Sequence, residues 1–162
     1  MTETESMVIP KLKARFDDKI LASFVHCGDE VVKLRKDAIV EVCQFLKEDP
    51  ELDFNFLMDL CGVDYLGQEP RFEVVYNLYS LRYRRRLRIR VPVPESDPEV
   101  ETLVSLWPGA NWFEREVWDM FGIKFQGHPN LKRILMYEEF VGHPLRKDYP
   151  ITKRQPLIGP QN

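Results

Sequence analysis

The sequence predicts an α+β fold, in which an antiparallel or mixed sheet of about four strands is packed with helices and followed by an extended C-terminal tail. Three observations predict it. The stretches "RFEVVYNLYSL" and "RRLRIRVPV" are rich in β-branched, aromatic or alternating apolar residues, as strands are. "DAIVEVCQFLKEDP" instead repeats its apolar residues at helical spacing. The last forty residues hold five of the twelve prolines and no long periodicity, which indicates extended chain.

Composition limits the class of protein. With 162 residues, 44% hydrophobic and 30% charged, the chain is long enough for one globular domain with its own core. The net charge of −3 provides no general attraction to nucleic acid or to anionic lipid. No run of eighteen apolar residues occurs, and the acidic start "MTETESMVIP" lacks the features of a secretion signal or a transit peptide.

The N-terminal region predicts a small helix and a hairpin. The first dozen residues are either frayed or form a short helix after Pro10. Two short strands follow at residues 20–27 and 30–34, and Gly28 with Asp29 forms the turn between them.

Two helices are predicted next. The first is ended by Pro50, and its apolar residues keep the spacing i, i+3, i+4, i+7: Ile39, Val42, Cys43 and Leu46. The second lies in "LDFNFLMDLCGVDY", where Asp53 is suited to cap a short helix that ends near Gly62.

The following hairpin has one buried and one half-buried strand. "RFEVVYNLYSL" is apolar on both faces, as a central strand is. "RRLRIRVPV" alternates strictly, so that one face is apolar and the other carries Arg86, Arg88 and Arg90. Pro92 indicates an edge or an end of this strand.

Residues 94–122 predict two further helices. In the first, Ser96 and Glu99 have the spacing of a capping box. In the second, Asn111 is the predicted cap and Gly122 the C-terminal stop. The apolar stripe of this second helix is Phe113, Val117, Met120 and Phe121.

The cysteines give no framework for a metal or a disulfide. Cys27, Cys43 and Cys61 are odd in number, and no CxxC spacing occurs. Each has apolar neighbours in the sequence, so all three are predicted to be buried free thiols. Such thiols are typical of a reducing compartment, here the cytoplasm.

Two "GHP" tripeptides contain His128 and His143, two of the three histidines. A zinc site could combine them with His26, Cys27 or a carboxylate. No helical spacing fixes their separation, however. The glycine and proline of each tripeptide instead predict a bend between extended segments, with the imidazole bonded to a backbone or carboxylate partner.

Residues 82–90 contain six arginines, which could bind nucleic acid because guanidinium groups grip phosphates. The acidic balance of the whole chain opposes that interpretation. An arginine face on a strand also suits carboxylates on a neighbouring element or on a partner protein.

Acidic residues gather in "NWFEREVWDMFG" and could form an acid–base set: Glu114, Glu116 and Asp119. Helix electrostatics explains them more simply. Arg115 and Asp119 are spaced i, i+4, and Glu114 and Glu116 lie in the first turn, where negative charge is favourable. No nucleophile motif or phosphate-binding loop accompanies them. Taken alone, the chain shows no active site.

The segments "EREVWDMFGIKFQGHPNLKRIL" and "GHPLRKDYP" resemble the thirty-kilodalton-subunit family of respiratory complex I, the NADH:quinone oxidoreductase. "FLMDLCGVDY" and the hairpin after it stand where the family has comparable segments. The matching signature residues are Glu114, Arg115, Glu116, Asp119, Phe121, Gly122, His128 and Pro129, followed by Lys132 and Ile134.

The resemblance implies a subunit of the hydrophilic arm of a proton-translocating complex, peripheral on the cytoplasmic side of the bacterial inner membrane. Such a subunit binds no cofactor itself; NADH, FMN, iron–sulfur clusters and quinone belong to other chains. Its chief partner is the quinone-site subunit, the D-type polypeptide that builds the quinone pocket. Related proteins in membrane-bound hydrogenases and in plastoquinone-type complexes are an alternative. Outside this class, a freestanding metalloenzyme that uses His128 and His143 is the rival hypothesis.

The resemblance also divides the protein into a domain at residues 1–134 and a partner-docking tail at residues 135–162. The tail has no core of its own, so its end is expected to become ordered on a partner. Its docking residues are His143, Pro144, Leu145, Arg146, Lys147, Asp148 and Tyr149. In an extended chain, Leu145 and Tyr149 would point the same way and anchor it.

Overall fold

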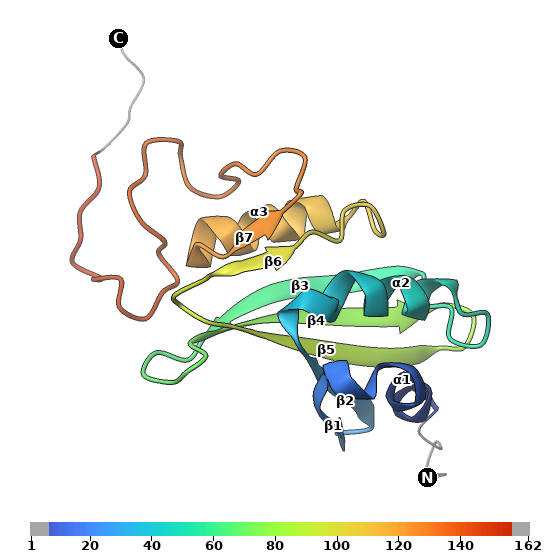
Figure 1. The fold of residues 1–162 in the computed structure, drawn as a ribbon. Helices are drawn as coiled ribbons and strands as arrows, with labels where there is room; N and C mark the ends of the chain where they lie inside the picture. The colour runs from blue at the N-terminus through green and yellow to red at the C-terminus, as the bar shows by residue number, and fades with distance from the viewer. Residues whose placement is uncertain (1–6, 157–162) are drawn as a thin grey trace.

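A mixed five-stranded sheet organises the molecule, in a computed structural model that describes residues 7–156 (Figure 1). The strand order is β1-β2-β5-β4-β3, with β2 and β5 parallel and the other neighbours antiparallel. The predicted α+β class and mixed sheet are confirmed, with one strand more than expected. The strands are β1 (Ile20–His26), β2 (Asp29–Leu34), β3 (Phe56–Asp64), β4 (Phe72–Ser80) and β5 (Arg85–Val93).

Three α-helices and a small second sheet complete the described part of the chain. The helices are α1 (Val8–Phe16), α2 (Ile39–Glu48) and α3 (Ala110–Phe121), and two 3-10 turns precede β1 and α2. Strands β6 (Glu99–Glu101) and β7 (Lys124–Gln126) pair in parallel beside α3 (Figure 1). No helix in residues 7–156 is long and apolar enough to cross a membrane.

A single core joins the helices to one face of the sheet. The apolar residues of β5 that alternate with its arginines are all buried there, together with the predicted stripe of α2. Helix α3 approaches β3 closely at Gly62, where an added Cβ would lie 2.7 Å from the Phe121 ring. The closeness of this contact requires glycine and positions α3 beside the sheet.

The helix predicted to begin at Asp53 is wrong, because this segment is strand β3. The register between β3 and β4 shifts between Leu57 and Asp59, so that Leu57 and Leu60 both face the core. The bulge therefore gives a strand the three-residue apolar spacing of a helix. Asp53 has φ +46 and lies in a turn rather than at a helix cap.

The segment after Pro94 corrects a second predicted helix. Residues 99–101 form β6, which pairs with β7, and the Ser96–Glu99 capping box does not exist. Helix α3 begins after Gly109 without a side-chain cap, so Asn111 is not its cap. Gly122 does end α3 in the left-handed region, at φ +79, as predicted.

Smaller corrections concern the N-terminal half. Helix α1 begins at Val8, ahead of Pro10, which the first helical turn tolerates. The β1–β2 turn is Cys27-Gly28 rather than Gly28-Asp29, and both turn residues have positive φ. Cys43 is buried as predicted, but Cys27 and Cys61 are exposed; all three are free thiols.

Residues 127–156 contain no helix or strand. They are less extended than predicted, because main-chain bonds from Phe140 to Tyr137, Arg146 to His143 and Tyr149 to Arg146 close successive turns. The positive φ values of Gly127 and Gly142 make both "GHP" tripeptides bends, as expected. Through these turns the chain returns to α3 and to the C-terminal end of β3, at Asp64.

Candidate functional site

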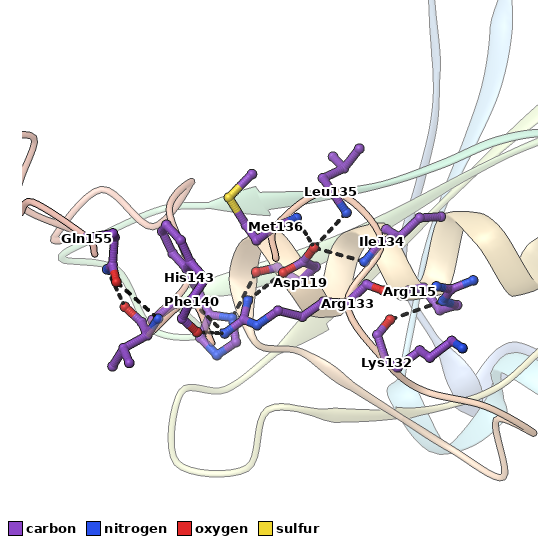
Figure 2. Close-up of polar contacts among 12 residues, drawn as sticks. Arg115, Asp119, Lys132, Arg133, Ile134, Leu135, Met136, Phe140, His143 and Gln155 are labelled. Carbon is purple, nitrogen blue, oxygen red and sulfur yellow. Dashed lines mark hydrogen bonds and ion pairs between the residues drawn. The ribbon is translucent and has the colours of Figure 1, made fainter. Parts of the chain in front are cut away.

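The C-terminal half of α3 contacts residues 133–149, and the signature residue Asp119 lies at the centre of this contact (Figure 2). Its side chain is fully buried. Oδ2 accepts the main-chain N–H groups of Ile134, Leu135 and Met136 at 3.1, 2.9 and 2.9 Å. Oδ1 accepts a bond from the Arg133 guanidinium at 2.5 Å. The carboxylate thus fastens four consecutive residues to α3.

Arg133 closes the loop that Asp119 begins. Its guanidinium donates to the carbonyl oxygens of Phe140 and Gly142, at 2.7 and 3.1 Å. The same group lies over the rings of Trp118 and Phe140, 5.7 and 5.5 Å from their centroids. One side chain therefore holds both ends of residues 133–142 and covers an aromatic surface of α3.

The electrostatics of Asp119 keep it ionised. Burial by itself would raise the pKa of this carboxyl, but the hydrogen bonds from Met136, Leu135 and Arg133 outweigh it, so the pKa lies below its usual value. Every oxygen of the carboxylate is occupied by donors. The arrangement therefore serves to fasten a segment, and it leaves no acceptor free for acid–base chemistry.

The second "GHP" completes the last turn of α3. Three consecutive carbonyl oxygens of this turn have no partner further along the helix. His143 Nδ1 lies 3.0 Å from the oxygen of Asp119, the Leu145 amide donates to Met120 at 3.1 Å, and Arg146 Nε donates to Phe121 at 2.6 Å. The tail thus caps α3, and a cation lies at the negative end of the helix.

Gly122 makes this close approach possible. An added Cβ would lie 2.7 Å from the His143 ring and 2.8 Å from the Arg146 guanidinium. Burial lowers the pKa of His143, and the nearby Arg146 and Arg133 lower it further. The imidazole is therefore neutral at pH 7 and hydrogen-bonds through Nδ1.

A second fastening joins the tail to the sheet through Arg71. Its guanidinium forms a buried two-bond pair with Asp64, at 3.0 and 2.9 Å. It also contacts Asp148 at 2.8 Å and Glu95 at 2.6 Å. The Lys147 amide donates to the same Asp64 carboxylate at 2.8 Å.

Hydrogen bonding from Arg71 lowers the pKa of both Asp64 and Asp148, and Asp64 raises that of Arg71. Sequence reasoning missed Asp64 and Arg71. The only signal in the sequence was that each is a charged residue at the end of an apolar strand. Charged residues that are simply exposed to solvent occupy the same kind of position, so the signal does not single out a buried pair.

The first "GHP" is fastened to the start of α3. His128 Nε2 lies 3.1 Å from the oxygen of Asn111, and His128 Nδ1 accepts the Asn130 amide at 3.0 Å. Arg115 donates to the carbonyls of Lys132 and Arg133 at 3.0 and 2.9 Å. The predicted Arg115–Asp119 pair within the helix is therefore wrong: each side chain binds the returning segment instead.

The predicted environment of Glu114, a solvent-exposed first turn of the helix, is also wrong. It is fully buried, and it accepts the Leu103 amide at 2.7 Å and the Thr102 hydroxyl at 2.5 Å. Burial raises its pKa to about 7, so it is not a charged residue in the first turn of a solvated helix. Glu116 is exposed.

The remaining predicted residues divide between the two fastenings and the surface. Phe121 packs on Gly62, and Tyr149 stacks on Phe140 at 6.0 Å. Leu145 is 55% exposed, and the chain turns between Arg146 and Tyr149, so these residues lack the extended geometry from which a common anchor was predicted; their contact with a partner stays a prediction. Pro129 is exposed and Pro144 is half-buried.

The two histidines bind different main-chain carbonyls of α3, which confirms the expected backbone partners. Over residues 7–156, no group of three His, Cys, Asp or Glu residues is arranged to hold a metal ion. Of the arginines on β5, Arg90 pairs with Glu73 at 2.6 Å, which confirms for this residue a carboxylate on a neighbouring strand.

Known proteins resemble this chain over most of its length. Residues 32–155 match the family model described as "Respiratory-chain NADH dehydrogenase, 30 Kd subunit". The chain is 55% identical over 151 residues to the C subunit of the NADH-quinone oxidoreductase of Roseiflexus sp. (strain RS-1), which covers 93% of this chain and 87% of the relative. It is 48% identical over 161 residues to the corresponding C subunit of Geotalea uraniireducens (strain Rf4), with 98% and 96% covered.

Two solved structures share the fold. The trypsin-resistant fragment (1-134) of Nqo5 has a TM-score of 0.67 and 37% identity, over 77% of this chain and 100% of the fragment. A component of the membrane-bound sulfane sulfur reductase, an archaeal respiratory membrane complex, has a TM-score of 0.75 at 19% identity, covering 90% and 85%. The second likeness concerns the fold alone. The family match and the identities show that the chain belongs to the family of the 30-kilodalton subunit of respiratory-chain NADH dehydrogenase.

Proposed function

We propose that this protein is the C subunit of a bacterial NADH-quinone oxidoreductase and that it has a structural and assembly role. It holds no cofactor of its own; NADH, FMN, iron–sulfur clusters and quinone are bound by other chains. The names of its relatives support this assignment over a hydrogenase or plastoquinone-type complex. The subunit lies on the cytoplasmic side of the inner membrane and reaches the membrane only through its complex.

The observation that carries the proposal is a set of exposed apolar side chains on the fastened segment, called the apolar stripe below. Its exposed side chains are Leu135 at 57%, Tyr137 at 36%, Val141 at 64%, Leu145 at 55% and Ile151 at 101%. Asp119, Arg133 and Arg71 hold the backbone that carries this stripe. Because the backbone is already ordered, little conformational entropy is lost when a partner covers the stripe. Exposed apolar groups on a rigid support are typical of protein interfaces. We assign the stripe to contact with the D-type quinone-site subunit.

The division into residues 1–134 and 135–162 stays part of this proposal. In it, the first region folds around its own core and the second provides the docking surface. A relative is known as a trypsin-resistant fragment (1-134), which supports a compact core in that protein. Residues 157–162 lie outside the described part of the chain.

Co-purification tests the proposal. A tagged chain is expressed in its host, membranes are solubilised in mild detergent, and the proteins retained are identified by mass spectrometry. We expect the subunits of an NADH-quinone oxidoreductase, with the quinone-site subunit among them. Recovery of the tagged chain alone would contradict the assembly role, and recovery of hydrogenase subunits would contradict the assignment to this complex.

A matched pair of substitutions tests the stripe itself. Leu145→Asp places a charge in the proposed interface, and Leu21→Asp places one at the β1 edge of the sheet, where Leu21 is 54% exposed. Loss of a buried apolar contact costs about 2 kcal/mol or more, so Leu145→Asp should reduce recovery of the quinone-site subunit by more than roughly tenfold. Equal recovery with both variants would remove the stripe from the interface.

A further inference from the structure

A second exposed surface lies at the other end of the sheet, where β3 begins and β4 turns into β5. Cross-strand pairing places Phe56 opposite Tyr79, and Tyr79 opposite Arg86, in one row. The neighbouring Leu78 and Leu87 are buried in the core, so this row faces away from the helices. In Figure 1, β4 points towards this end and away from the red C-terminal segment.

Apolar and cationic side chains share this end of the sheet. Phe56 is 48% exposed and Leu81 is 61% exposed. Arg82, Arg84 and Arg86 are exposed beside them. These five residues are called the arginine patch below.

The fold uses none of the three exposed guanidinium groups in an ion pair among residues 7–156. Among these three guanidinium groups, only that of Arg82 lies over an aromatic ring within residues 7–156, at 5.3 Å from the centroid of the adjacent Tyr83 ring. Elsewhere the chain pairs its arginines: Arg90 with Glu73, and Arg71 with Asp64. The protein has 26 acidic and 23 basic residues, so carboxylates are plentiful, yet within residues 7–156 none forms an ion pair with Arg82, Arg84 or Arg86. Clustered like charges repel and are stabilised when a partner supplies the opposite charge.

A groove lies on the same sheet face and begins one row beyond the patch, at the cross-strand pair Asn77 and Arg88. It has a volume of about 460 Å³, and Arg88, two residues beyond Arg86, is part of its wall. Its floor includes Val31, Val63 and Val75. The groove also contains Glu73, whose side chain is 4% exposed. Arg90 pairs with this carboxylate, and the valines beside it offer contacts to the apolar side chains of a polypeptide.

We propose that the arginine patch and the adjoining groove bind an acidic segment of a partner polypeptide. Carboxylates of the segment pair with Arg82, Arg84 and Arg86, and an apolar side chain packs between Phe56 and Leu81. Arginine forks match carboxylates in two-bond geometry, and arginine with aromatic residues is typical of the energetic centre of interfaces. This surface is separate from the apolar stripe, so the protein joins two partner segments at opposite ends of its sheet.

Site-specific photocrosslinking tests the proposal in intact cells that produce the full chain. The photoreactive residue p-benzoylphenylalanine replaces Leu81, the cells are irradiated, and the adduct is sequenced by mass spectrometry. We expect one adduct, with a peptide of another protein that carries at least two carboxylates close to the attachment point. No adduct, or an adduct with RNA or lipid, would overturn the proposal. An adduct with the protein's own residues 1–6, which include Glu3 and Glu5, would also overturn it.

Charge reversal provides the control. Arg82→Glu in the Leu81 crosslinking variant should reduce the adduct by about tenfold or more, because opposite charges set the pairing. Lys13→Glu, an equal charge change at an exposed position of α1, should leave it unchanged. Reversing the captured carboxylate to lysine should restore the Arg82→Glu adduct, whereas failure of this rescue would contradict a direct ion pair. The crosslink forms in intact cells before membranes are solubilised, so its failure is distinguishable from failure of the assembly role, which is measured by co-purification.

Discussion

Asp119 and Arg133 are fourteen residues apart in the sequence, yet they form an ion pair of 2.5 Å at the last turns of α3 (Figure 2). The Asp119 side chain is fully buried, and that of Arg133 is 15% exposed. The pair joins the signature helix to the segment that we assign to docking. Loss of this pair would leave a buried charge without its partner. It would also remove the contact that holds the backbone under the apolar stripe.

Replacement of Asp119 should therefore destabilise the subunit strongly. Asp119→Ala leaves Arg133 without its buried partner and three main-chain N–H groups without acceptors, so we expect a loss of about 3–5 kcal/mol in the free energy of unfolding. Glu116→Ala, on the same helix but exposed, should change it by less than about 0.5 kcal/mol. Urea unfolding of the isolated subunit measures both. Similar values for the two variants would show that Asp119 is not a fastening residue.

The two aspartates that share Arg71 should differ in importance. The Asp64 side chain is 1% exposed and that of Asp148 is 48% exposed. Asp64→Asn should cost about 3 kcal/mol because it breaks a buried pair, and Asp148→Asn less than about 1 kcal/mol because solvent screens that contact. Chemical denaturation at pH 7 compares them directly, and a larger effect of Asp148→Asn than of Asp64→Asn would contradict this view of the clamp.

Low pH should destabilise the subunit by protonating the aspartates of the two fastenings. The folded pKa values of Asp64, Asp148 and Asp119 lie below their unfolded values. Their stabilisation is therefore complete above the unfolded pKa and is lost as the pH falls through the folded values. Unfolding free energies measured on the acid side of the unfolded pKa should accordingly fall more steeply for the wild type than for Asp64→Asn.

Glu114 should make the subunit less stable as the pH rises towards neutrality. Its pKa is raised to about 7 by burial, above the unfolded value, so its stabilisation is complete below the unfolded pKa and is lost as the pH rises through about 7. A shift of this size corresponds to roughly 3 kcal/mol at high pH. Glu114→Gln removes the titrating proton and should flatten this part of the pH dependence.

The difference between wild type and Glu114→Gln isolates the effect, since His143 titrates in both. The lowered pKa of His143 acts with the opposite sign: its contribution is complete above its unfolded pKa and is lost as the pH falls. Unfolding free energies measured from about pH 5 to about pH 8 provide the two curves. Parallel curves would mean that Glu114 does not titrate in this range.

The tail should be protected in the free subunit between residues 145 and 149. The amides of Leu145 and Lys147 donate to Met120 and to Asp64, and hydrogen exchange of these amides should be slow. These contacts oppose the expectation that this part of the tail becomes ordered only on a partner. Exchange as fast as in an unstructured peptide would restore that expectation.

Gly122→Ala should abolish this protection. It forces alanine to a φ of +79 and pushes a Cβ against His143 and Arg146, which should cost about 1–2 kcal/mol or more. Gly109→Ala is the matched control, because nothing lies within 4 Å of its added Cβ. Hydrogen exchange and thermal unfolding of the two variants distinguish a local release of the tail from a general loss of stability.

The sequence by itself determined the elements whose pattern is local. Helix α2, the β4–β5 hairpin and the end of α3 at Gly122 all follow from the spacing of apolar residues and from one glycine. The two ordered motifs around residues 114–149 were enough to identify the family. Each of these features is encoded within a few residues, where side-chain periodicity and backbone preference act together.

Only the tertiary structure decided the rest. A bulge made β3 look like a helix, since pairing with β4 along the whole strand overrode the local three-residue spacing. The partners of Asp119, Arg115 and Asp64 come from segments 7 to 83 residues away. A charged residue looks the same in the sequence whether water or a buried arginine surrounds it. The fold decides between these two environments. A buried charge without a partner is costly, whereas a buried charge with a partner holds the two segments that carry the pair in one position.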